Sequence, residues 1–77
     1  MRIAPNPVGD RSTITYDPQE EPVTLTLTDL HGNAINSWED DGDGETTIQA
    51  GNLPGGLYLI RLRTKEGNSA FIKMVKE

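Results

Sequence analysis

Apolar and polar residues alternate along much of this chain, which is the periodicity of a β-strand with one buried face. The segment VTLTLT (residues 23–28) has three apolar residues on one face and three threonines on the other. In LYLIRLRT (residues 57–64), Tyr58, Ile60 and Leu62 share a second apolar face. Both segments therefore predict strands with one side in a core.

Glycine and proline interrupt the chain so often that the longest uninterrupted intervals, residues 57–66 and 68–77, contain ten residues each. A typical helix has about 11–12 residues, and these intervals are rich in β-formers. The sequence therefore predicts an all-β fold with no helix and about seven short, mainly antiparallel strands. The expected strands are Ile3–Ala4, Ser12–Tyr16, Val23–Thr28, Ala34–Glu39, Thr46–Gln49, Leu57–Thr64 and Ser69–Glu77.

Turn residues separate these strands. Asp29 can cap a turn through its carboxylate, and Gly32 can adopt positive φ there. Pro54 fixes φ in a later turn, where Gly55 and Gly56 are free to adopt positive φ. Short strands joined by such turns predict a small immunoglobulin-like β-sandwich. The residues expected in its core are Ile14, Val23, Leu25, Leu27, Ile35, Ile48, Leu53, Tyr58, Ile60 and Leu62.

The last strand has one face that suits a core and one that does not. An unpaired buried ammonium is costly, so Lys73 must face solvent, and Ile72 and Met74 then point inward. Exposed apolar patches tend to mark interaction sites, although a tolerated exposed face is the alternative. The outward residues of this strand and its neighbour form such a patch around a lysine: Leu57, Leu59, Phe71, Lys73 and Val75.

Composition narrows the range of functions. The chain has 77 residues, no cysteine and a formal charge of −5, so it is one small domain without disulfides or thiolate metal sites. An acidic surface repels phosphate, which argues against nucleic-acid partners and anionic membranes. No apolar run reaches the roughly 18 residues of a membrane helix. We therefore expect no direct membrane insertion.

No catalytic or metal constellation is evident. The single histidine, His31, lies inside a predicted turn, where a solvated side chain is expected. Asp41 and Asp43 have the spacing of calcium ligands, but Glu45 and Thr46 occupy positions that an EF-hand loop does not allow. We therefore expect a solvated hairpin turn at EDDGDGE (residues 39–45), no metal, no cofactor and no enzyme activity.

Four motifs follow one another in a recognisable order: PNP (residues 5–7), VTLTLTDLHG (23–32), LPGGLYLIRL (53–62) and IKMVKE (72–77). With them, the whole chain resembles the type A C-terminal sorting domain of type IX secretion cargo in Bacteroidetes. Ala4 departs from the aromatic residue that this family often has before Pro-Asn-Pro. The departure affects only the N-terminal motif.

The resemblance implies that residues 1–77 form one C-terminal sorting domain, excised from a larger secreted protein. Such a domain is recognised in the periplasm by the outer-membrane translocon and its associated processing machinery. In many relatives it is then cleaved, and the cargo is attached to the cell surface or released. We expect a monomer without catalysis of its own.

Residue by residue, the family's motifs fall on Asp29 and Gly32, on Gly56 and Tyr58, and on the closing segment 72–77. An ordered terminal strand avoids the entropic cost of ordering a loose tail on binding. We therefore expect the machinery to recognise this strand and its neighbour through Leu57, Leu59, Phe71, Lys73, Val75, Lys76 and Glu77.

The alternative is an immunoglobulin-like adhesive or carbohydrate-binding module of a secreted multidomain protein. Sugar binding usually uses exposed aromatic rings, and few are available because Tyr58 and Tyr16 are expected in the core. Trp38 is expected in the core or at its rim. Further domains after Glu77 would favour the module, whereas a gene that stops there would favour the sorting role.

Overall fold

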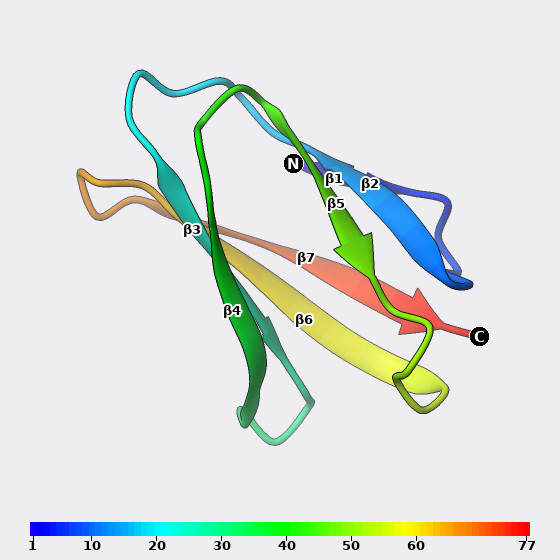
Figure 1. Cartoon of the computed structure of the whole chain (residues 1–77). Coiled ribbons are helices and arrows are strands. Elements are labelled where there is room, and N and C mark those ends of the chain that lie inside the picture. Colours follow the sequence, from blue (N-terminus) through cyan, green and yellow to red (C-terminus); the bar gives the residue numbers. More distant parts are fainter.

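Seven β-strands and no helix make up the fold, which a computed structural model describes for residues 1–77 (Figure 1). No helix that could cross a membrane is present. The strands are β1 (Arg2–Ala4), β2 (Arg11–Thr15), β3 (Val23–Thr28), β4 (Ala34–Asp40), β5 (Glu45–Gln49), β6 (Gly56–Arg63) and β7 (Ser69–Lys76). Every predicted strand is present, and no boundary differs from its prediction by more than one residue.

The strands form two sheets that pack face to face. The smaller sheet has the order β1-β2-β5, the larger has the order β4-β3-β6-β7, and all neighbouring strands are antiparallel. Consecutive strands pair at β1–β2, β3–β4 and β6–β7, while β5 belongs to the other sheet from β4 (Figure 1). The predicted all-β sandwich is therefore confirmed.

The core lies between the two sheets and is built from their inward faces. Eight of the ten residues predicted for it are buried, and Leu53 is partly buried against it. Each fully buried Val, Leu or Ile stabilises the fold by about 1.5–3 kcal/mol, which matters in so small a domain. The buried apolar residues are Ile3, Val8, Ile14, Tyr16, Val23, Leu25, Leu27, Ile48, Ala50, Tyr58, Ile60, Leu62 and Met74.

Ile35 is the exception, because its side chain is 42% exposed. The register of β3 and β4 shifts at a β-bulge: Leu27 pairs with Asn36, but Thr28 pairs with Ala34. Ile35 is left without a partner on β3, at the free edge of the sheet. Asn36 and Trp38 pair with the buried residues Leu27 and Leu25, so regular alternation along β4 already directs Ile35 away from the core. The prediction that Ile35 lies in the core is therefore wrong.

Two hydrogen bonds link the sheets near the β4–β5 turn. The indole N–H of Trp38, which is partly buried at the rim of the core, donates to Thr46 Oγ1 at 3.2 Å. The hydroxyl of Tyr16 donates to a carboxylate oxygen of Asp40. Burial and this hydrogen bond raise the pKa of Tyr16 to about 12. Both bonds join an edge of the larger sheet to the smaller one.

Candidate functional site

The last strand, β7, has one face in the core and one in solvent. Met74 is fully buried, and Ile72 is partly buried against the core. Phe71 and Val75 point the other way and are 64% and 39% exposed, with Lys73 exposed between them. The inward and outward sides predicted for this strand are therefore confirmed.

The exposed apolar surface continues from β7 onto β6. Leu57, which is exposed, lies opposite Val75 in the strand register. Leu59, which is partly buried, lies opposite Lys73. Cross-strand pairs of this kind place their side chains in contact range on one face. We call this surface the β6–β7 outer face and define it by Leu57, Leu59, Phe71, Lys73 and Val75.

Arg61 adds a second cation to the same side of the sheet. It lies opposite Phe71 in the register and is partly buried. The recognition residues expected from the sequence did not include it. The signal in the sequence is that Arg61 alternates with Leu57 and Leu59, which places all three side chains on one face of the strand. Arg63, which is exposed, alternates with Arg61 on the same side, so this side of the sheet combines apolar side chains with three positive charges on a chain of net charge −5.

The outer edge of β7 is covered by the segment that follows β1. Val75 N–H donates to Asn6 Oδ1 at 2.9 Å, and Asn6 Nδ2 donates to the carbonyl of Lys73 at 3.3 Å. Further along, Val8 N–H donates to the carbonyl of Val75 at 2.6 Å, and Glu77 N–H donates to the carbonyl of Val8 at 3.0 Å. The carboxyl-terminal half of β7 therefore has hydrogen-bond partners on both edges.

Sequence analysis identified Pro5–Pro7 only as one motif of a family resemblance and missed this contact. A signal was present, because proline has no backbone N–H and cannot donate to a neighbouring strand. The side-chain amide of Asn6 carries an N–H donor and a carbonyl acceptor, so it can pair with both a C=O and an N–H group of a strand edge. An asparagine between two prolines is thus suited to pair with a strand edge through its side chain.

The last two residues lie against the turn before β6. A Cβ on Gly55 would lie 3.2 Å from the backbone oxygen of Glu77, so a larger residue there would crowd the end of the chain. The hydroxyl of Tyr58 donates to the carbonyl of Pro54 at 2.5 Å and holds this turn. Lys76 Nζ donates to the backbone oxygen of Glu77 at 3.1 Å. The turn and the terminal residues therefore form one packed unit.

The remaining predicted turn residues also occupy turns. Asp29 Oδ1 accepts the backbone N–H groups of His31 and Asn33 at 2.8 and 3.0 Å. The hydrogen bonds from Asn33 and His31 lower the pKa of Asp29. Gly32 has φ of 84° and Gly56 has φ of 153°, both positive as predicted, whereas Gly55 does not adopt positive φ. His31 is exposed, so its side chain is in solvent.

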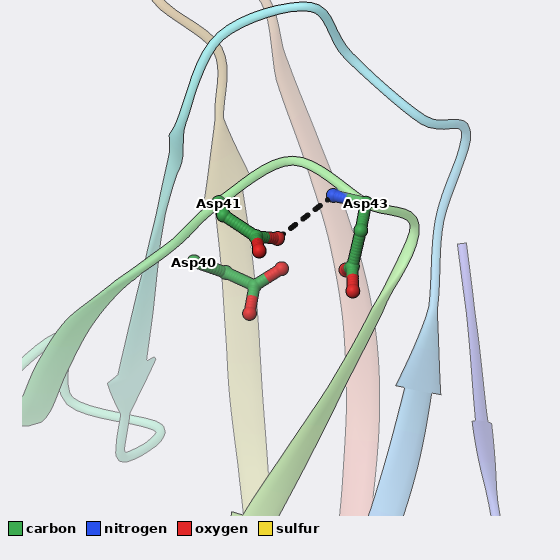
Figure 2. Close-up of side chains that lie close together, drawn as sticks. All are labelled: Asp40, Asp41 and Asp43. Atoms are coloured by element: carbon green, nitrogen blue, oxygen red, sulfur yellow. Dashed lines mark hydrogen bonds between the residues drawn. The ribbon is translucent and has the colours of Figure 1, made fainter.

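The β4–β5 turn brings together three carboxylates, from Asp40, Asp41 and Asp43, whose oxygens lie within 4.8 Å of one another (Figure 2). Asp41 Oδ1 accepts the N–H of Asp43 at 3.1 Å, and Asp43 Oδ1 accepts the N–H of Glu45 at 3.1 Å. Asp40 accepts the hydroxyl of Tyr16. These bonds explain the cluster as a turn that connects the two sheets, and no metal site is proposed from it. The expectation of a hairpin at residues 39–45 is wrong, because β4 and β5 do not pair with each other.

The order of the motifs and the sandwich fold agree with a comparison to known families. A model of the family described as the secretion system C-terminal sorting domain matches residues 2–77. The chain belongs to this family. The resemblance to type IX sorting domains, stated from the four motifs, is therefore confirmed.

One curated relative of this sorting domain is an endo-acting ulvan lyase of Formosa agariphila. It is 33% identical over 75 residues, which cover 97% of this chain and 14% of that protein. The chain thus corresponds to a small part of the relative. The source of the relative fits the predicted origin in Bacteroidetes.

The family supports a role in sorting and not in catalysis. Its domains act in type IX secretion and interact with that machinery, and the proteins that carry them are secreted or placed at the cell surface. The comparison assigns no function to individual residues. The role of the β6–β7 outer face is therefore a matter for proposal.

Proposed function

We propose that residues 1–77 direct a parent protein through the type IX secretion system, and that the outer-membrane translocon binds the β6–β7 outer face together with Lys76 and Glu77. Family membership carries the sorting role. The proposed route runs through the periplasm to the outer membrane. There the processing machinery cleaves the domain and attaches the cargo to the cell surface or releases it. The domain acts as a monomer and performs no chemistry itself.

The geometry of β7 favours recognition through side chains. Partners that add a strand to a sheet need an edge with free N–H and C=O groups. At the carboxyl-terminal half of β7, Asn6 and Val8 already occupy that edge. The side chains of Phe71 and Val75 remain exposed, and the strand is fixed before any partner arrives. A preorganised face avoids an ordering cost on binding.

The composition of the outer face supports the same conclusion. Apolar area at the centre of a contact and arginine or aromatic residues beside it are typical of strong interaction sites. Phe71 is the most exposed large apolar residue in the chain at 64%, and Arg61 lies opposite it. We propose that the partner surface is apolar at its centre with acidic groups that face Lys73 and Arg61.

The alternative of a carbohydrate-binding module has less support from the positions of the aromatic rings. Tyr16 and Tyr58 are buried, and their hydroxyls bond to Asp40 and Pro54. Trp38 is partly buried. An isolated exposed phenylalanine does not make the platform of stacked rings on which sugar binding usually depends.

The sorting role is tested by fusing residues 1–77 to a periplasmic reporter. The fusion is expected to reach the cell surface or the medium of a host with the type IX system. It is expected to stay in the periplasm of an otherwise identical strain without the translocon. Surface exposure is measured by protease accessibility in intact cells, with the unfused reporter as control. Export in both strains, or in neither, contradicts the proposal.

A further inference from the structure

The smaller sheet has three strands and the larger sheet has four. The strand that the smaller sheet lacks would lie on one side of the sandwich. On the other side the sheets are aligned, because β1 packs near β7. Three strands therefore cover three of the four strands of the larger sheet. The inner face of β4 has no strand above it, since β5 is the last strand of the smaller sheet. Figure 1 shows β4 and β5 diverging from their shared turn.

A groove of about 370 Å³ lies in this position. The hydrogen bond from Trp38 to Thr46 lies beside it, toward the β4–β5 turn, and Ile35 lines it farther from that turn. The exposed side chain of Ile35, which is the unpaired residue at the bulge in β4, forms part of its wall. The other residues that line the groove include Leu27, Asn36, Trp38, Ile48 and Leu53.

The edge of β5 beside the groove carries free backbone groups. In an antiparallel pair, successive residues direct their N–H and C=O groups alternately toward and away from the partner strand. Ala50 N–H donates to the carbonyl of Asp10 at 2.7 Å, at the end of the β2–β5 register. By alternation, Thr47 and Gln49 direct their N–H and C=O groups away from β2, and both residues line the groove.

The segment that borders the groove, from β4 through the turn to the end of β5, carries the net charge of the whole chain. Residues 34–50 contain five acidic residues and no lysine or arginine. The other residues contain seven acidic and seven basic side chains, so their charges cancel and the total of −5 belongs to this segment. The acidic residues lie at the turn end of the groove: Glu39, Asp40, Asp41, Asp43 and Glu45.

We propose that this groove binds an extended, cationic segment of a partner polypeptide, which adds to β5 as a fourth strand of the smaller sheet. Alternate apolar side chains of that segment pack against Trp38 and Ile35. Its backbone pairs with Thr47 and Gln49, and its basic end lies at the acidic turn. This surface is separate from the β6–β7 outer face and does not depend on the sorting proposal.

A second copy of this chain does not fit the same position. Its own groove edge is equally acidic, so two copies would bring like charges together. Its cationic strand β6 is already paired on both edges, and the carboxyl-terminal half of β7 is covered by Asn6 and Val8. The charge and the free edge together favour a different, basic polypeptide.

The proposal is tested with two short synthetic peptides of alternating valine and threonine, one with two lysines at its amino end and one with them at its carboxyl end. Trp38 is the only tryptophan and lines the groove, so its fluorescence reports binding at this place. One peptide is expected to bind and change the emission of Trp38. Which one binds reveals the orientation of the added strand, because the acidic turn precedes β5. Binding is expected to weaken from about 0.05 to about 0.5 M salt.

Matched variants separate strand addition from charge attraction. Thr47→Pro removes the outward N–H at an edge position that tolerates proline, and about tenfold weaker binding is expected. Thr47→Ala keeps that N–H and is expected to bind as the native chain does. Ile35→Asp alters an exposed wall residue and is expected to weaken binding while the melting temperature changes little. The Ile35→Asp variant remains informative if the Thr47→Pro variant fails to fold.

Several results overturn the proposal. They are the absence of any change in Trp38 emission with either peptide, equal binding of a peptide with the same composition and no alternation, and unchanged binding to Ile35→Asp. A concentration-dependent change in Trp38 emission without peptide, accompanied by dimers in sedimentation, would show that a second copy occupies the groove.

Discussion

The contact between Asn6 and the edge of β7 predicts a specific loss when its side chain is removed. Asn6→Ala eliminates the hydrogen bonds to the N–H of Val75 and the carbonyl of Lys73, which measure 2.9 and 3.3 Å. A typical intramolecular hydrogen bond contributes about 0.5–1.5 kcal/mol. Asn6 is exposed, so water can replace part of each bond. We expect a loss of about 1 kcal/mol in the free energy of unfolding.

For a domain of this size, a loss of that magnitude lowers Tm by about 4–8 °C. Circular dichroism measures this change, and Asn52→Ala serves as the control because Asn52 is exposed. Hydrogen exchange provides a local measurement. The amide of Val75 donates to Asn6, so its exchange is expected to accelerate more than that of amides in β3. An unchanged Tm together with unchanged exchange at Val75 would refute the reasoning.

The remaining predictions concern the core, a turn and one titration. Met74→Ala removes a fully buried side chain and is expected to cost about 2–5 kcal/mol in chemical denaturation, whereas a loss below 1 kcal/mol would contradict its place in the core. Tyr58→Phe removes the bond to Pro54 and is expected to lower Tm by several degrees, and no change would show that the bond does not hold the turn. Tyr16 has a raised pKa of about 12 against 10.0, so its contribution to stability is complete below pH 10 and lost as pH rises toward 12. Asp40→Asn is expected to lower this pKa in a titration by ultraviolet absorbance, and an unchanged value would mean that their bond has no effect.

Alternation and turn chemistry predicted most of the fold because they are local properties. VTLTLT forms a strand with the predicted ends, and its inward face is buried. The outward orientation of Lys73 followed from the cost of burying a charge, which needs no knowledge of neighbouring strands. Ile35 could not be placed in this way. Its exposure depends on the register of β4 against β3, which directs Asn36 and Trp38 toward the core side, and a register is a property of two strands together.

The candidate site was predicted only in part for the same reason. The cross-strand pairs Leu57–Val75 and Leu59–Lys73 follow from alternation once β6 and β7 form a hairpin. The role of Asn6 depends on a contact across 69 residues of sequence, which no local pattern reveals. The groove between β4 and β5 likewise arises from the strand order of two sheets.

The central claim is that the β6–β7 outer face carries the sorting signal. It is tested most directly by the export of a reporter fused to residues 1–77 with Lys73→Asp and Val75→Asp. Both residues are exposed, so Tm is expected to change little, and export is expected to fail.

The matched control combines Arg11→Asp and Thr15→Asp, which produce the same change in charge on exposed residues of β2 in the opposite sheet. Its export is expected to equal that of the native domain. If the variant of β7 folds and is exported as well as this control, the outer face is not what the machinery recognises.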